Sequence, residues 1–282
     1  MKTSGNYVLT PQGRVHKSRV HQVVSNGGPT SGPPPGDSVV RAVSPNGWKA
    51  SATFAADVPL GKMSVKFTVP ERPDVDGAII FLFAGAENAQ MKMILQPVLQ
   101  WGDNGLTGLP DNDCWTIACW YVSPNGQWYV SNPVPVFPGD TVTGTVEVVG
   151  CSKEDGEWMC EWMIEASSTP SNVSTALVST ALRNGDILPN GDKVPLMLPW
   201  LMLFLVGAAL EAYPQDPCCK GLTPEQYPAG GSTTFNHIEL TDLAGEGFVA
   251  DWNARCALDD SGCDCKNTVE ISRDKSTITL NY

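Results

Sequence analysis

The sequence has little charge and few histidines for its length. Only 17% of its 282 residues are charged, and its three histidines are His16, His21 and His237. These are too scattered to favour a Ser-His-Asp triad or a histidine-based metal site. Gly-x-Ser-x-Gly, His-Glu-x-x-His, Walker and Gly-x-Gly-x-x-Gly motifs are absent as well, which disfavours the common hydrolase, zinc-peptidase and nucleotide-binding classes.

Positive charge is scarce relative to negative charge. Lys and Arg number 18 against 30 Asp and Glu, giving a net charge of −12. Such a surface repels phosphate groups, so we expect neither nucleic acid nor an anionic membrane as a partner. The most apolar run, 194–210, contains two prolines and falls short of the roughly 20 uninterrupted residues of a membrane helix. We expect it to form a buried central strand.

Cysteine is frequent, with nine residues, and this favours disulfides and an extracellular location. Cys151 and Cys160 flank a turn-like segment and could bridge a hairpin. The first twenty residues nevertheless lack the apolar stretch of a signal peptide. The cysteine spacing does not supply the ligand pairs of a zinc site, so we expect no metal and no cofactor.

Turn residues divide the chain into short apolar segments, with 27 Gly and 23 Pro. This spacing, without helical periodicity, predicts an all-β, two-sheet antiparallel sandwich. We expect a polar arm and linker over 1–38, the sandwich over 39–248 and a Cys-rich extension over 249–282 that ends in a strand. The expected strands are 49–56, 62–69, 77–84, 91–101, 115–122, 127–133, 141–149, 158–166, 174–181, 200–213, 233–242 and 276–281.

Four segments, in order, resemble the glutamic peptidases of the eqolisin type. The first is Gly-Trp-Lys-Ala-Ser-Ala at 47–52, followed by a strand that ends in Val-Pro at 69–70. The second is Ile-Leu-Gln at 94–96, after Ala-Gly-Ala at 84–86. The third is Cys-Trp-Tyr-Val at 119–122, followed by Pro-Gly-Asp at 138–140. The last is Leu-Glu-Ala-Tyr at 210–213, with Thr-Phe at 234–235.

The resemblance implies a concanavalin A-like sandwich, or jelly roll, with a catalytic dyad of Gln96 and Glu211. It also implies an acid-acting hydrolase that cleaves peptide bonds. The sequence departs from the family pattern after Gln96, where Pro97 to Gln100 replace a polar Gly-Val-Asp, and in lacking the tryptophan that usually precedes it. A relative of the fold that has lost the activity is therefore a second interpretation.

The residues around the dyad agree with this chemistry. On a strand, Gln96 shares a face with Val98 and Gln100. Glu211 follows a nearly uninterrupted apolar run, so burial should raise its pKa. A partly neutral carboxyl can act as a general acid, and its ionised form as a general base on water. The alternative is that Gln96 and Glu211 hydrogen-bond each other in the core.

Tryptophans suggest another function. Aromatic platforms in a groove bind sugar rings or an extended peptide, so a lectin, lyase or glycosidase is an alternative. We expect the substrate, peptide or polysaccharide, to contact Gln100 and the aromatic residues Trp48, Trp101, Trp115, Trp120 and Trp128. Glu161 and Glu165 could also form a paired-carboxylate site, although solvent-facing alternation explains their spacing equally well. We expect a monomer.

Overall fold

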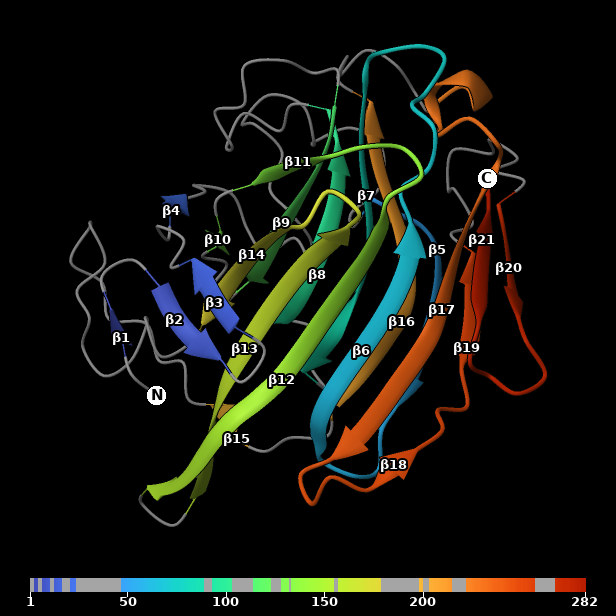
Figure 1. The fold of residues 1–282 in the computed structure, drawn as a ribbon. Helices are drawn as coiled ribbons and strands as arrows, with labels where there is room; N and C mark the ends of the chain where they lie inside the picture. The colour runs from blue at the N-terminus through green and yellow to red at the C-terminus, as the bar shows by residue number, and fades with distance from the viewer. Residues whose placement is uncertain are drawn as a thin grey trace.

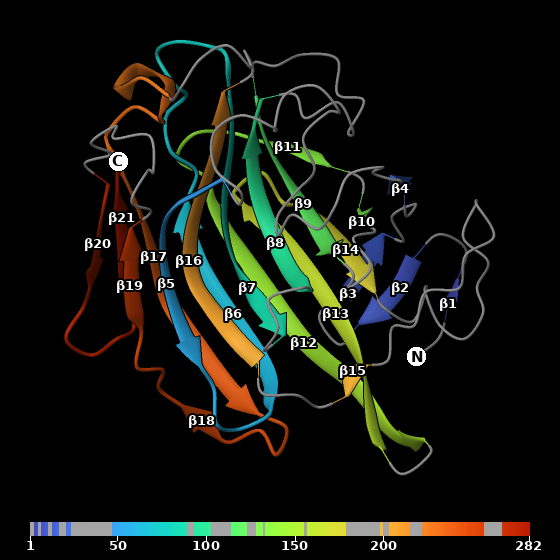
Figure 2. The same ribbon diagram turned by 180° about the vertical axis from the view of Figure 1, so that it is seen from behind.

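Two antiparallel β-sheets are stacked face to face in the computed structural model (Figure 1). The structure describes residues 47–88, 93–102, 114–122, 128–131, 133–154, 157–178, 203–214, 222–256 and 267–282, together with short strands at 3–4, 7–10, 13–16, 21–23 and 198–199. The expected all-β, two-sheet sandwich is confirmed. The view from behind shows the sheet that carries β7, β8 and β16 in front (Figure 2).

We call this sheet sheet I. Its strand order is β19 (Asn253–Cys256), β5 (Trp48–Ala55), β16 (Leu203–Pro214), β7 (Ala78–Asn88), β8 (Ile94–Trp101), β9 (Trp115–Val122), β10 (Trp128–Val130) and β4 (His21–Val23), with β11 (Val134–Val136) also paired to β9. The part of the apolar run 194–210 that begins at Leu203 therefore forms a central strand, as expected, whereas Leu198–Pro199 forms β15 in the other sheet; the rest of the run lies outside the described residues. None of the described helical segments is long and apolar enough to cross a membrane.

Sheet II lies on the other side of the core. Its order is β14 (Val173–Val178), β13 (Glu157–Thr169), β12 (Thr141–Glu154), β6 (Leu60–Thr68), β17 (Ser232–Asp242), β21 (Ile278–Asn281) and β20 (Thr268–Ile271), with β15 (Leu198–Pro199) on β13 and β18 (Gly247–Phe248) on β17. A small separate sheet contains β1 (Thr3–Ser4), β2 (Tyr7–Thr10) and β3 (Gly13–His16), and one 3-10 turn, η2, spans Pro224–Gln226.

Every segment expected to be a strand contains one. The strands that the sequence did not reveal are short, two to four residues each, such as β11, β18, β19 and β20. Segments of this length carry too little alternation to be recognised. Strands β19, β20 and β21 add the end of the chain to both sheets, and β4 pairs with β10.

The two sheets differ in how they are buried. Strand β6 alternates between buried and more exposed residues, as expected for a sheet with one wet face. Every residue of β8 and β9 is buried. Sheet I is therefore covered on both faces in its centre.

The shared core fills the space between the sheets. Each sheet contributes the alternate residues that face its partner, including Leu82 and Leu99 of sheet I and Val65 of sheet II. Ring contacts strengthen this packing, as between Phe67 and Phe235, whose centroids are 4.6 Å apart.

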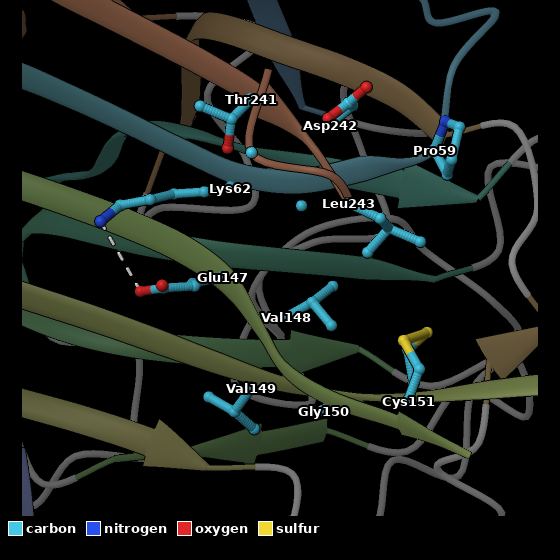
Figure 3. Close-up of a pocket in the computed structure, with 13 residues that line it drawn as sticks. Pro59, Lys62, Glu147, Val148, Val149, Gly150, Cys151, Thr241, Asp242 and Leu243 are labelled. Atoms are coloured by element: carbon cyan, nitrogen blue, oxygen red, sulfur yellow. Dashed lines mark ion pairs between the residues drawn. A yellow bond between two sulfur atoms is a disulfide. The ribbon is translucent and has the colours of Figure 1, made fainter. Parts of the chain in front are cut away.

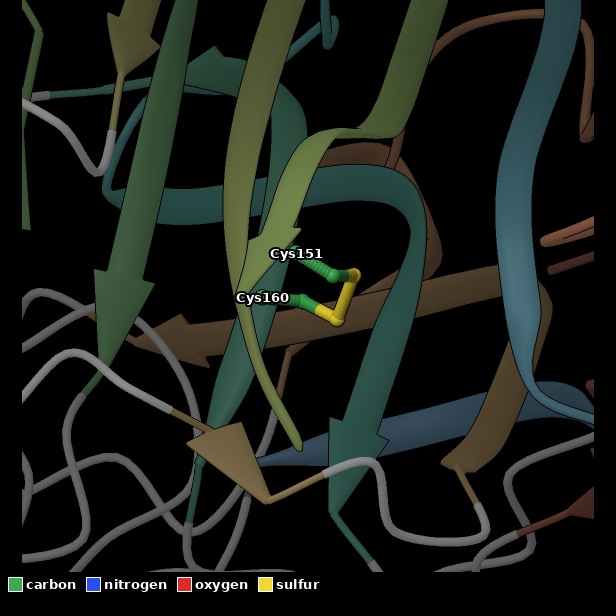
Figure 4. Close-up of a disulfide and its surroundings, with 2 residues drawn as sticks. All are labelled: Cys151 and Cys160. Carbon is green, nitrogen blue, oxygen red and sulfur yellow. A yellow bond between two sulfur atoms is a disulfide. The ribbon is translucent and has the colours of Figure 1, made fainter. Parts of the chain in front are cut away.

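A disulfide joins Cys151 of β12 to Cys160 of β13 (Figure 4). The two cysteines are directly paired in the antiparallel ladder of the hairpin. The bridge proposed from the sequence is confirmed.

Asp140 fastens the turn before β12 to the end of β13. Its Oδ2 accepts hydrogen bonds from the backbone N–H of Phe137 (3.3 Å), from Ser168 Oγ (3.0 Å) and from Ser171 Oγ. The Ser171 hydroxyl and the other donors hold the pKa of this carboxyl below its usual value. The Pro-Gly-Asp segment is thus a structural clamp.

We expect Asp140→Ala to lower the free energy of unfolding by about 2–4 kcal/mol, because it leaves the buried Ser168 and its neighbours without their acceptor. Asp140→Asn retains one acceptor oxygen and should lose less. Urea unfolding at pH 7 measures both. An Asp140→Ala protein as stable as wild type would show that these bonds are not stabilising.

Candidate active site

Gln96 and Glu211 lie on the same face of sheet I, the one turned away from sheet II. We call it the far face. Gln96 of β8 lies between Ile94 and Val98, and Glu211 of β16 lies between Ala209 and Tyr213; these four flanking residues belong to one buried cluster separate from the main core. Both candidate residues have no solvent exposure.

The strand register fixes their relative positions. Phe81 of β7 pairs with Glu211 on one side and with Gln100 on the other. Gln96 lies four residues from Gln100 along β8 and pairs with Trp120 of β9. Gln100 is therefore the glutamine directly across β7 from Glu211, in the same cross-strand row. Gln96 lies diagonally across β7 from Glu211, four residues from that row along β8. The Nε2 of Gln100 donates a hydrogen bond to the carbonyl of Gly102 (2.9 Å).

Gly85 allows β7 and β8 to approach closely next to Gln96. A Cβ at this position would overlap the carbonyl oxygen of Leu95 and lie 3.2 Å from the Cβ of Gln96. Only glycine fits there without displacing β8. The central glycine of the Ala-Gly-Ala segment thus contributes to positioning Gln96.

Several buried polar atoms of the far face have no hydrogen-bond partner in the described structure. They are Oε1 and Nε2 of Gln96, Oε2 of Glu211, and the indole Nε1 atoms of Trp48 and Trp120. Trp120 is the cross-strand neighbour of Gln96, and Trp48 is that of Glu211. Buried polar groups are normally paired, so these atoms mark the surroundings of Gln96 and Glu211 as a candidate site; others, such as Trp115 Nε1 and the Tyr121 hydroxyl, lie in the main core.

The second oxygen of Glu211 is held by Tyr213. The Tyr213 hydroxyl donates a hydrogen bond to Oε1 of Glu211 from two residues further along the same strand face. Gly47 makes room for this tyrosine, because a Cβ at Gly47 would overlap the Tyr213 ring, and its φ of 62° also favours glycine. The glycine of the Gly-Trp segment therefore helps to orient Glu211.

Electrostatics favour the neutral form of Glu211. Burial raises its pKa well above the usual value; the hydrogen bond from Tyr213 opposes this shift, and the charge of Glu87 adds to it. Burial also raises the pKa of Glu87 to about 7. The far face therefore carries two glutamates whose burial raises their pKa values, and the charge of Glu87 adds to the shift of Glu211.

Glu87 and Tyr213 were not identified from the sequence. Strand alternation could have found both: Tyr213 follows Glu211 by two residues, and Glu87 follows Gly85 by two at the end of an apolar strand. Glu87 is only 5% exposed, which is unusual for a glutamate that has no cationic partner in the part of the chain that the structure describes.

The structure corrects the expected tryptophan groove. Trp101 and Trp115 belong to the core between the sheets, where their rings lie 5.4 Å apart. They are an odd number of residues from Gln96 and from Trp120 in their strands, so they point to the opposite face. Trp48 and Trp120 do lie beside the site, and the side chain of Trp128 is outside the described residues.

The other carboxylate pair is on sheet II. Glu161 and Glu165 lie on the outer face of β13, and burial, followed by the charge of Glu147, raises the pKa of Glu165. They are remote from Gln96. Within the described residues, no group of three or more acidic, histidine or cysteine side chains is arranged to hold a metal ion.

A pocket of about 590 Å³ opens on sheet II, where β12 bends away from β6 (Figure 3). The ion pair between Lys62 Nζ and Glu147 (3.7 Å) lines one part of it, and Cys151 lines another. None of the candidate site residues lines this pocket.

The architecture is shared with peptidases of known structure. Scytalido-glutamic peptidase with a peptide-based transition-state analogue matches with a TM-score of 0.51 and 13% identity, over 83% of this chain and 98% of that one. SCP-B, a member of the eqolisin family in complex with the tripeptide Ala-Ile-His, matches with a TM-score of 0.51 and 12% identity over the same shares. No family profile and no curated protein sequence matches the chain. At such low identity the finding establishes the fold: the chain has the two-sheet sandwich of the glutamic peptidases.

Glu87 makes stability depend on pH. Since its pKa is about 7 in the folded protein and 4.5 by default, the folded state holds a proton that the unfolded state releases between these values. Stability should therefore fall as pH rises from about 4.5 to 7, by about 3 kcal/mol for this group. Glu87→Gln cannot titrate, so its gain in stability over wild type should be about 3 kcal/mol larger at pH 8 than at pH 4.

Urea unfolding across this pH range tests the effect, with the exposed Glu71→Gln as the control for removing one negative charge. Parallel curves for wild type and Glu87→Gln would show that Glu87 is already ionised in the folded protein.

Proposed function

We propose that the protein is an acid-acting hydrolase that cleaves peptide bonds with Glu211 and Gln96. The main observation in its support is that several buried polar atoms around these two residues, on one face of the sheet, have no hydrogen-bond partner in the described structure. A bound peptide would supply partners for them. The fold shared with glutamic peptidases supports the same function.

In the proposed reaction, ionised Glu211 takes a proton from a water molecule as that water attacks the peptide carbonyl. The Gln96 amide donates a hydrogen bond to the oxyanion that forms, which requires the substrate carbonyl to lie between the row of Glu211 and that of Gln96, four residues away along β8. Glu211 then returns the proton to the leaving nitrogen. The hydrogen bond from the Tyr213 hydroxyl orients the carboxyl and stabilises its ionised form, which is present before the first proton transfer and again after the second.

Substrate can reach the two residues only if the far face opens, because neither has solvent exposure. Opening also matters for protonation. Burial keeps Glu211 neutral, and contact with water would bring its pKa back toward the ordinary carboxyl range. The ionised form would then be available at pH 3–4.

The proposal also covers the location, the partners and the oligomeric state of the protein. A disulfide is compatible with an extracellular protein. Two of the tryptophans expected to stack on sugars lie in the core, while Trp48 and Trp120 lie beside the site, so carbohydrate binding is kept as the alternative. We retain a monomeric peptidase as the proposal.

We expect the wild-type protein to cleave an acid-denatured protein substrate at pH 3–4. Glu211→Gln should lower kcat/KM by roughly 10³-fold or more, since it removes the proton-transfer group, and Gln96→Ala by roughly 10²–10³-fold. Peptide release followed by mass spectrometry measures these rates.

The matched control is Glu165→Gln, a partly buried glutamate on sheet II that should leave the rate unchanged. Cleavage by Glu211→Gln at the wild-type rate would refute the mechanism. Absence of cleavage by folded wild-type protein would favour a relative that has kept only the fold.

A further inference from the structure

Glu87 has no role in the mechanism above, yet it shares the face of the proposed site. It lies in β7 two residues beyond Gly85, and its cross-strand neighbour in β8 is Ile94, two residues before Gln96. Its exposure is 5%, and no hydrogen bond to Glu87 is formed within the described residues. Glu87 is thus a nearly buried carboxyl beside the proposed oxyanion donor.

The charged and titratable groups that face Glu87 do not neutralise it. The neighbouring strand β16 presents Glu211 and Tyr213, and β8 presents the uncharged Gln96 and Gln100. Lys49, on the more distant β5, is buried and forms no ion pair with either glutamate in the described structure. Among the described residues, no cation is paired with Glu87 at this end of the site.

Apolar residues accompany the carboxyl along this end of the far face. Ile94 and Val122 lie in its cross-strand row, and Phe83 and Val206 belong to the same cluster. An apolar wall with a single carboxyl is suited to a long side chain with a methylene stem and a terminal cation. Lysine and arginine have this chemistry.

We propose that Glu87 is a specificity-determining residue that binds the cationic side chain of a peptide substrate, so that the site selects peptides with a lysine or arginine. This inference rests on the proposed function for its choice of a peptide. The net charge of −12 would also steer cationic peptides toward the protein.

The proposal has a thermodynamic signature. A cation next to Glu87 favours its ionised form and so lowers its pKa from about 7. At pH 6 a cationic peptide should therefore displace a proton on binding, and its affinity should rise between pH 5 and pH 7. A peptide with an uncharged side chain of equal length should show neither effect.

Two peptides that differ only in lysine or norleucine at one position provide the test. Binding is measured by calorimetry to the full-length Glu211→Gln protein, which is expected not to cleave them, and to Glu211→Gln/Glu87→Gln. We expect the lysine peptide to bind on the order of tenfold more tightly at pH 7 in the first protein, with a smaller ratio at pH 5. The ratio should fall to about one in the second protein. Calorimetry at pH 6 in buffers of different ionisation enthalpy reports the proton release.

An equal preference for lysine in both proteins, equal binding of the two peptides at pH 7, or no binding of the lysine peptide would each overturn the role of Glu87. Circular dichroism confirms that both variants are folded. Cleavage by wild type is measured separately. Glu87-dependent binding without cleavage would refute the peptidase function and leave the recognition site standing, whereas cleavage without a lysine preference would do the reverse.

Discussion

The burial of sheet I on both faces is the constraint on which the site depends. One face of sheet I packs into the core, and the other carries apolar side chains that are themselves buried, so the centre of the sheet has no wet surface for polar side chains. Any carboxyl on this sheet must be protonated, hydrogen-bonded or paired with the positive charge of a ligand, because an unpaired buried charge is costly. Glu211 and Glu87 meet this condition through raised pKa values, and Glu211 also through its bond with Tyr213.

Sheet II serves a different purpose. Its outer face carries charged side chains, including the ion pair of Lys62 with Glu147, and its turns are held by local polar contacts such as those of Asp140. The disulfide secures its long hairpin. Sheet II thus has a charged outer face and locally fastened turns, while Gln96, Glu211 and Glu87 lie on the far face of sheet I.

The fold could be predicted from the sequence because turns and apolar segments repeat along most of the chain. The apolar run that ends at Glu211 and the cysteines that flank a turn each have a direct physical meaning, and both interpretations are confirmed. Four segments that follow one another in the same order as in the glutamic peptidases also indicated the shared fold, although no single motif was specific.

The site was less predictable, since it depends on which face each residue occupies. Gln96 and Glu211 lie on one face, whereas Trp101 and Trp115, which the sequence analysis grouped with them, belong to the core by strand parity. Glu87 resembles any glutamate at a strand end until its burial is known. Register across three strands, which decides that Gln100 shares the row of Glu211, cannot be read from local sequence.

Gly47 links the backbone at the edge of β5 to the acid–base group. The space left by its missing side chain is occupied by the Tyr213 ring, whose hydroxyl holds Glu211. Replacing glycines by alanine is a common way to stabilise proteins through the unfolded chain. At Gly47 an alanine would have the opposite effect, because its methyl group would displace the Tyr213 ring and break the hydrogen bond to Glu211. In a family of related sequences, this glycine and this tyrosine should consequently change together or not at all.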